Sequence, residues 1–321
     1  MATFVLIHGA GDVGWYWHLT EAELRARGHH TIAPDLPCDN DTATLDDYVS
    51  TVADAAGSRR DLVIVSQSYG AFTATVAASL LPARQLVLLA GMIPAPGESP
   101  AQWWAGTGYR QAAAEQARLH GGTTGHDDPL ITFYNGIPRP LAEEALRRGG
   151  RGESSVVYNT PCPLDAWPDV PTKFILCKDD HFFPAAFMRQ MARQRLGAVP
   201  DEVPGCHCAA LSNPGELAGL LVSYLDELTS VRRGDELQDA SRRQVLLVDP
   251  HAERRERVLD RAHHRRRGHD HAALAHAAEV DVGVERHGLQ VLYLDPGNVA
   301  GGRQQVVHER GRPEVAVLVV G

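Results

Sequence analysis

The first 230 residues alternate between short apolar runs of β-forming residues and longer stretches with helical periodicity, and this alternation most constrains the fold. The apolar runs are continuous, as expected of parallel strands that are buried on both faces. We expect strands near residues 3–8, 31–33, 61–65, 86–90 and 173–177, and helices near 17–27, 44–56, 69–81, 184–196 and 214–228. Strands separated by such helices predict an α/β fold with a doubly wound, mainly parallel sheet.

One long interruption breaks this alternation between the strands expected near residues 86–90 and 173–177. A crossover loop of this length is too long for a compact domain, so we predict a helical cap insertion at about residues 94–170. Taken singly, each aromatic residue of the insertion is expected to pack it onto the core. Together with Gly9 below them, these residues suit the lining of an apolar substrate pocket: Trp103, Trp104, Phe133, Tyr134 and Trp167.

The composition changes near residue 231, which divides the chain into an expected domain at 1–230 and an extension at 231–321. The extension holds 15 arginines and 8 of the chain's 16 histidines, but no tryptophan, phenylalanine, lysine, cysteine or methionine. With so few large apolar side chains, this segment can bury little apolar surface to offset the conformational entropy that the chain loses when it becomes ordered. We expect a weakly ordered tail, with a small α+β module and a nucleic-acid-binding arm as alternatives. The composition also resembles an out-of-frame reading of GC-rich coding DNA.

Charge and cysteine content exclude several classes of protein. The formal net charge is −9, which does not suit a nucleic-acid-binding chain, and no apolar run approaches the length of a membrane span. We expect no signal peptide, and the odd number of five scattered cysteines indicates free thiols in a reducing, cytoplasmic setting. Cys206-His207-Cys208 lacks a second ligand pair at zinc-like spacing, and the glycines near residue 9 form no dinucleotide fingerprint. We therefore expect neither a metal nor a cofactor.

A serine lies at an expected strand-to-helix turn in the segment Ser66-Gln67-Ser68-Tyr69-Gly70. A nucleophile at such a turn sits on a sharp bend, and the residues two before and two after it must be small because they cross closely. Ser66 and Gly70 meet this requirement around Ser68. Ser66 is the weaker candidate for the nucleophile, because bulky Ile64 would then occupy one of the tight positions.

A serine nucleophile needs a base, an acid that orients the base, and donors for the oxyanion. Asp179 and Asp180 follow the strand expected at 173–177, and His207 follows in a later glycine-containing loop, with His181 as a rival base. The order serine, aspartate, histidine at successive strand ends is that of one class of serine hydrolases. The loop after the first strand can turn the Ala10 N–H toward the oxyanion, with the Tyr69 N–H as the second donor.

Residues 3–228 resemble the compact branch of the α/β-hydrolase fold that includes plant-type methylesterases and hydroxynitrile lyases. The resemblance is carried by His8-Gly9-Ala10-Gly11 followed by Trp15-Tyr16-Trp17, by the serine turn, by Asp180-x-x-x-Pro184, and by Pro204-Gly205-Cys206-His207. In that family the acid stands four residues before the proline, which implies Asp180 rather than Asp179. The resemblance implies a Ser68–Asp180–His207 triad, acyl transfer without a cofactor, and a small-molecule ester as substrate.

Other activities on the same fold remain alternatives: a hydroxynitrile lyase, a perhydrolase, or a non-catalytic small-molecule binding protein. The lyase branch typically has threonine after the first strand's histidine and lysine after the catalytic histidine, where this chain has Gly9 and Cys208. A pure binding protein has no need of all three triad residues. We therefore favour hydrolysis of a small to medium hydrophobic carboxylic ester. Nothing in the sequence sets an oligomeric state.

Overall fold

The computed structural model describes residues 1–228, which contain a six-stranded sheet in which every pair of neighbouring strands is parallel. The predictions for residues 231–321 lie outside the described residues. The strand order is β2-β1-β3-β4-β5-β6. The strands are β1 (Thr3–Ile7), β2 (His30–Ile32), β3 (Leu62–Gln67), β4 (Ala83–Leu89), β5 (Thr172–Cys177) and β6 (Asp201–Val203).

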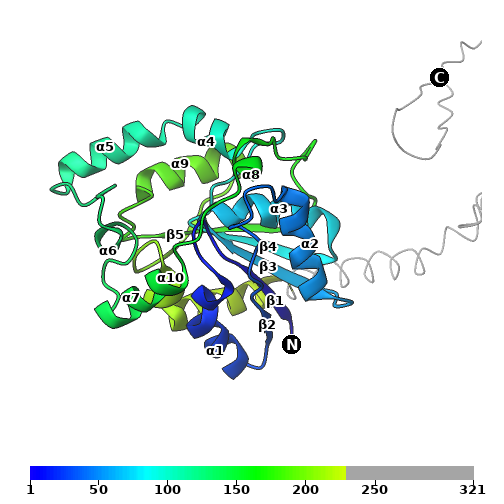
Figure 1. Ribbon diagram of the computed structural model, residues 1–321. Coiled ribbons are helices and arrows are strands. Elements are labelled where there is room, and N and C mark those ends of the chain that lie inside the picture. Colours follow the sequence, from blue (N-terminus) through cyan, green and yellow to red (C-terminus); the bar gives the residue numbers. More distant parts are fainter. Residues whose placement is uncertain (229–321) are drawn as a thin grey trace, which may run out of the picture. The chain divides into compact units, whose positions relative to one another are not determined.

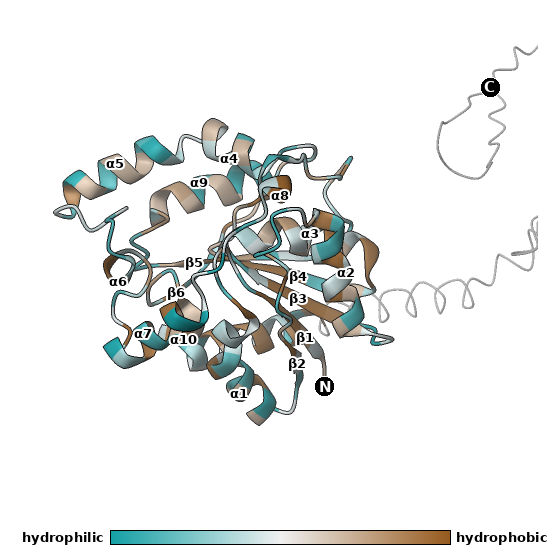
Figure 2. Ribbon diagram, viewed as in Figure 1, coloured by the Kyte–Doolittle hydropathy of each residue, from teal (hydrophilic) through white to brown (hydrophobic). Residues whose placement is uncertain are grey.

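The central strands are apolar because helices cover both faces of the sheet. All six residues of β3 are buried, and Figure 2 shows the central strands as a brown, hydrophobic layer. Figure 1 shows α2 (Leu45–Ala56), α3 (Ala71–Leu80) and α9 (Ala185–Leu196) over one face. Under the other face lie α1 (His18–Ala26), α10 (Ala209–Ser212) and a helix over residues 214–228. The predicted doubly wound α/β fold is confirmed.

Three of the expected helices begin with a defined local feature, either a capping box or a short 3-10 helix. Thr44 caps α2 in a reciprocal capping box with Asp47, which satisfies backbone donors that the first helical turn leaves free. Two short 3-10 helices, η1 (Gly14–Trp17) and η2 (Ser68–Gly70), precede α1 and α3. The chain therefore enters α1 and α3 through a turn that is tighter than an α-helical turn.

The interruption between β4 and β5 contains five helices that form the predicted cap. They are α4 (Pro100–Gly106), α5 (Tyr109–Leu119), α6 (Pro129–Thr132), α7 (Arg139–Arg148) and α8 (Ser155–Asn159). Figure 1 shows α4 and α5 beside α9, beyond the edge of the sheet. Trp103 of α4 is completely buried, and its indole N–H donates to the Ile93 carbonyl at 3.1 Å. This tryptophan anchors the cap to the chain that leaves β4.

The sequence analysis did not predict β6. This strand has three residues, Asp201–Val203, of which two are acidic, so it offers no apolar run to recognise. It pairs with β5 at the edge of the sheet and leads directly into the loop that carries His207. Within the described residues, no helix combines the length and the apolar character needed to cross a membrane.

Candidate active site

Every predicted catalytic residue follows the carboxyl end of a strand. Because neighbouring strands are parallel, these ends meet at one edge of the sheet. The loop at residues 9–11, called the oxyanion loop below after its predicted role, follows β1, and Ser68 follows β3. Asp180 follows β5, and His207 follows β6. The topology therefore brings together four segments that are far apart in the sequence.

Ser68 occupies a strained backbone position at the turn between β3 and α3. Its φ angle is +52°, in the left-handed region that residues other than glycine rarely adopt, at a cost of about 1–3 kcal/mol. Gly70 allows the turn to close, because a Cβ atom there would lie 2.4 Å from the His8 carbonyl oxygen. Ser66, the rival candidate, lies within β3, fully buried and paired with Ile7 and Leu88. Only Ser68 stands at the turn.

Asp180 and His207 form a buried pair. The Nδ1 atom of His207 lies 2.7 Å from Asp180 Oδ2, and both side chains are almost fully inaccessible to solvent. The other carboxylate oxygen, Oδ1, accepts hydrogen bonds from the Phe182 and Phe183 amides at 2.7 and 2.9 Å. These donors hold the carboxylate in one orientation, so it can fix the imidazole tautomer with the hydrogen on Nδ1.

The two rival residues of the same loop have other partners. The Asp179 carboxylate is exposed and accepts a hydrogen bond from the Gly205 amide at 2.9 Å. His181 points its Nδ1 at the Ile131 carbonyl of the cap, 2.9 Å away. Adjacent residues thus have separate contacts: Asp180 contacts the imidazole, Asp179 holds the loop at residues 204–208, called the histidine loop below, and His181 contacts the cap.

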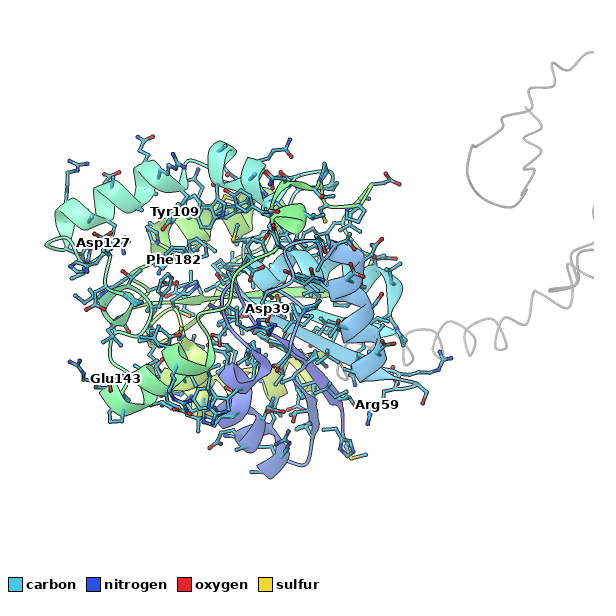
Figure 3. The ribbon with its side chains drawn as sticks, viewed as in Figure 1. Asp39, Arg59, Tyr109, Asp127, Glu143 and Phe182 are labelled. Atoms are coloured by element: carbon cyan, nitrogen blue, oxygen red, sulfur yellow. The ribbon has the colours of Figure 1, made fainter. Side chains whose placement is uncertain are left out.

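Three phenylalanine rings surround the His207 imidazole. The rings of Phe182, Phe183 and Phe133 have centroids 5.0, 5.3 and 5.7 Å from it. The Tyr109 hydroxyl of α5 donates to the Phe182 carbonyl at 3.1 Å, and these two side chains lie close together in Figure 3. The sequence analysis did not assign Phe182 and Phe183 to the site. Their position directly after Asp180 was the signal that could have done so.

The oxyanion loop is held on its inner side by His8. The ring Nδ1–H donates to the Gly9 carbonyl at 2.9 Å, while Nε2 accepts from the Leu36 amide at 3.1 Å. Burial lowers the pKa of His8 to about 4, so the ring is neutral at pH 7 and keeps this tautomer. The Gly9 carbonyl and the Ala10 N–H belong to one peptide plane, and trans geometry directs the N–H away from His8.

Gln67 connects this loop to the serine turn and the histidine loop. A Cβ atom at Gly9 would lie 2.1 Å from Gln67 Oε1 and 3.1 Å from Ser68 Cβ, so the oxyanion loop packs directly against the turn. The amide of Gln67 donates to the His207 carbonyl at 3.4 Å. One side chain therefore touches both flanks of Ser68. Tyr69, whose N–H was predicted as the second oxyanion donor, follows in η2 with a buried ring.

The predicted pocket residues divide between two places. Phe133 and half-buried Trp104 contact Phe182, beside His207. Burial raises the pKa of the Tyr134 phenol, and the proximity of Cys208 and Asp12 raises it further, which places this ring near the histidine loop.

Trp103 has no exposed surface, so it packs the cap rather than lining an open space. The structure does not bring Trp167 to the site. Its indole donates to Thr172 Oγ1 at 3.1 Å, at the start of β5, whereas Asp180 follows the other end of that strand.

The two cysteines beside His207 are buried, neutral thiols. Burial raises the pKa of Cys206 to about 11 and that of Cys208 well above its usual range, so both thiols are neutral at pH 7. All five cysteines lie in the described part of the chain and are free and buried. Across residues 1–228, no group of three or more His, Cys, Asp or Glu side chains has the arrangement of a metal site.

Comparison with known proteins relates the chain to ester hydrolases. Residues 4–220 match the family described as "Alpha/beta hydrolase family". Methylesterase 9 of Arabidopsis thaliana is 23% identical over 71% of this chain and 99% of its own length. The pyrethroid hydrolase of Sphingobium wenxiniae is 25% identical over 71% of this chain and 89% of its own length. The crystal structure of polyneuridine aldehyde esterase superposes with a TM-score of 0.56 at 17% identity, covering 70% of this chain and 99% of that one.

Proposed function

This chain belongs to the alpha/beta hydrolase family, and we propose that it hydrolyses a small to medium hydrophobic carboxylic ester through Ser68, His207 and Asp180. The observation that carries the proposal is the buried hydrogen bond of 2.7 Å between His207 and Asp180, on the same sheet edge as the strained serine turn. An aspartate that fixes the Nδ1–H tautomer leaves Nε2 free to accept a proton. Relatives named methylesterase and pyrethroid hydrolase support ester chemistry.

In the acylation step, His207 Nε2 removes the proton of the Ser68 hydroxyl as its oxygen attacks the ester carbonyl carbon. The carbonyl oxygen becomes an oxyanion, which the Ala10 and Tyr69 N–H groups stabilise. Asp180 stabilises the imidazolium that forms. His207 then gives its proton to the leaving alcohol as the carbon–oxygen bond breaks, and the acyl group remains on Ser68.

In the deacylation step, His207 takes a proton from water, and the resulting hydroxide attacks the acyl-enzyme carbonyl. The same two amides hold the second oxyanion. Its collapse releases the carboxylic acid and returns the proton from His207 to Ser68. Each proton removed is returned within one cycle, so no cofactor is required.

The surroundings of the site favour an apolar substrate. Phe133, Phe182 and Trp104 present aromatic surface next to His207, and aromatic rings bind apolar acyl or alkoxy groups.

The two positions that typically distinguish a hydroxynitrile lyase do not favour cyanohydrin cleavage in this chain. Gly9 has no side-chain donor for a cyanohydrin, and the buried neutral thiol of Cys208 cannot stabilise cyanide as a lysine would.

Replacing Ser68 with alanine tests the proposal. We expect kcat for p-nitrophenyl butyrate to fall about 10⁴-fold or more, while the fold is retained. The matched control is Ser66→Ala, which removes a buried hydroxyl with no hydrogen-bond partner among the described residues and should leave kcat within about twofold. Mass spectrometry should locate a fluorophosphonate adduct on Ser68. An adduct on Ser66, or undiminished turnover of the Ser68 variant, contradicts the triad.

The alternative activities have separate tests. Cyanide release from mandelonitrile that depends on Ser68 and exceeds ester turnover would replace the esterase with a lyase. Peracid formation from peroxide and a carboxylic acid, faster than ester hydrolysis, would indicate a perhydrolase. Ligand binding without fluorophosphonate labelling would indicate a binding protein.

We also propose that residues 1–230 are sufficient for catalysis. All the residues assigned to the reaction, and every tryptophan and phenylalanine of the chain, precede residue 230, and the family match ends at residue 220. A chain ending at Ser230 should keep the kcat of the full chain within about twofold. An insoluble or inactive truncated protein would contradict this division.

A further inference from the structure

The oxyanion loop is contacted from outside by a segment of the cap. Residues 149–154, between α7 and α8, are called the strap here. The Glu153 carboxylate accepts a hydrogen bond from the Gly11 N–H at 3.1 Å, and the Arg151 N–H donates to the Gly11 carbonyl at 3.4 Å. A Cβ atom at Gly149 would lie 2.7 Å from that same carbonyl oxygen. Both polar groups of the Gly11 backbone are therefore held by the strap.

These contacts restrict the backbone of Ala10, whose N–H is a proposed oxyanion donor. Ala10 lies between the Gly9 carbonyl, which His8 holds, and the Gly11 N–H, which Glu153 holds. Gly11 has a φ angle of +70°, and glycine has more backbone freedom than any other residue. Without an acceptor for the Gly11 N–H, the peptide between Ala10 and Gly11 would be less restrained, because the remaining strap contacts reach only the Gly11 carbonyl. His8 restrains the backbone before Ala10, and Glu153 restrains the backbone after it. Together they limit the direction in which the Ala10 N–H points.

Glu153 is itself held in place by the core of the molecule. Its second oxygen, Oε2, accepts a hydrogen bond from the Tyr48 hydroxyl of α2 at 3.3 Å. Burial raises the pKa of this carboxyl, whereas the Gly11 amide, the Cys38 and Tyr48 side chains and the charge of Arg151 act to lower it. One carboxylate thus bridges α2 and the oxyanion loop from a position on the cap.

We propose that Glu153 is a positioning residue that orients the Ala10 N–H for oxyanion stabilisation, so that the site is fully competent only while Glu153 holds the Gly11 N–H. This inference rests on the proposed ester hydrolysis and adds to it a role for the cap in catalysis. Glu153 touches neither substrate nor nucleophile. It acts through the backbone of Gly11.

The strap also makes contacts that do not involve the oxyanion loop, and these supply a matched control. The Ser154 hydroxyl donates to the carbonyls of Ala43 and Asp41 at 2.6 and 3.1 Å. Arg151 forms an ion pair with Asp39. Ser154→Ala therefore weakens the docking of the strap but leaves the Glu153–Gly11 hydrogen bond intact. A purely structural role of Glu153 would make the two variants behave alike.

The test compares Glu153→Ala, Glu153→Gln and Ser154→Ala in the full chain, with p-nitrophenyl butyrate as substrate. We expect Glu153→Ala to lower kcat about 10- to 100-fold, because a small misplacement of a catalytic group has effects of this size, and to change KM less than about threefold. Glutamine still offers an oxygen to the Gly11 N–H, so Glu153→Gln should stay within about threefold of the wild type. Ser154→Ala should lower the melting temperature but keep kcat within about twofold.

Equal kcat values for Glu153→Ala and Ser154→Ala would overturn the inference, as would a Glu153→Gln variant as impaired as Glu153→Ala. If Glu153→Ala does not fold, Glu153→Met takes its place, because methionine has similar length and no strong acceptor. Hydrogen exchange of the peptide containing Gly11 should be faster in the Glu153→Ala or Glu153→Met variant than in Ser154→Ala. This readout requires no turnover. A wild type without esterase activity or Ser68 labelling would refute the proposed function, whereas unchanged Gly11 exchange would refute the role of Glu153.

Discussion

The two flanks of Ser68 are built in different ways. On the acid–base flank, Asp180 and His207 lie 27 residues apart, and the Phe182, Phe183 and Gly205 amides that hold this flank come from the same two loops. On the oxyanion flank, the loop after β1 depends on Leu36 through His8 and on Glu153, which is 142 residues from Gly11. The hydrogen bonds that orient Asp180 and His207 lie within these two loops, although cap side chains also contact them, whereas the Gly11 N–H on the other flank is held by a carboxylate of the cap.

Because of this difference, substitutions on the two flanks should reduce activity to different extents. The acid–base flank depends on a few short hydrogen bonds within its own loops, so a change to one residue there removes a chemical step. The oxyanion flank is held by several contacts from different elements, so single changes there misplace a group that is still present. Substitutions on the first flank should therefore have larger effects than substitutions on the second.

The largest effect is expected from Asp180→Asn, which keeps the shape of the side chain but allows the wrong tautomer of His207. We expect kcat to fall about 10⁴-fold with little change in the fold, as is typical when the orienting acid of a triad is replaced by its amide. Asp179→Asn is the matched control. Its amide oxygen can still accept from the Gly205 N–H, so kcat should stay within about threefold. Equal losses in the two variants would contradict the division of roles between these neighbours.

Asp12, at the end of the oxyanion flank, should make the fold less stable as the pH rises. Burial raises the pKa of this carboxyl to about 7, and within residues 1–228 its Oδ1 accepts a hydrogen bond from the neighbouring Val13 N–H alone. Because the pKa is raised above the unfolded value of 3.8, folding favours the protonated form, and that stability is lost as the pH rises from about 4 to about 7.

Asp12→Asn should therefore be more stable than the wild type by roughly 4 kcal/mol at pH 8, with little difference below about pH 3. Urea unfolding at a series of pH values measures this difference. A difference that is independent of pH would show that the carboxyl ionises normally.

Gly70→Ala tests how closely the serine turn approaches the oxyanion flank. The new methyl group would lie 2.4 Å from the His8 carbonyl, a backbone atom that cannot rotate away, so we expect a loss of about 2 kcal/mol in unfolding free energy. Gly219→Ala, in the helix over residues 214–228, meets no atom within 4 Å and should be neutral or stabilising. Calorimetry distinguishes the two variants, and similar melting temperatures would contradict the close approach.

The smallest effect is expected from Tyr48→Phe, which removes one of the two hydrogen bonds of the Glu153 carboxylate. Stability should fall by about 1 kcal/mol and kcat by about two- to fivefold, because Glu153 keeps its contact with Gly11. Tyr224→Phe removes a comparable hydrogen bond, to Asp201 at 2.6 Å, away from the site. It should cost similar stability without lowering kcat. A loss of kcat in both variants would contradict a specific effect of Tyr48 on the oxyanion flank.

The same contrast explains what could be predicted from the sequence. Continuous apolar runs predicted five of the six strands, but the short acidic β6 has no such pattern. Ser68 and His207 could be predicted because each stands in a local motif. The choice of Asp180 over Asp179 needed the family resemblance, since both are aspartates at the same strand end.

Glu153 could not be predicted, because its role depends on a contact across 142 residues and its surroundings are polar and rich in glycine. Trp167 was expected in the pocket because it is aromatic and belongs to the insertion. The sequence does not show that its side chain lies at the start of β5, opposite the end that Asp180 follows. Local chemistry could be predicted from the sequence, whereas support that depends on the docking of distant segments could not.

The contact between Gly11 and Glu153 also has a consequence for the order of events during synthesis. At about 5–20 residues per second, the ribosome needs roughly 7–30 s to progress from Gly11 to Glu153, and longer to reach His207. Ser68 is synthesised during that interval, before Glu153 and before His207, the proposed base. Under the proposed mechanism, ester hydrolysis therefore begins only after the late segments have docked on the early ones, and an incomplete chain is expected to be a poor catalyst of acyl transfer.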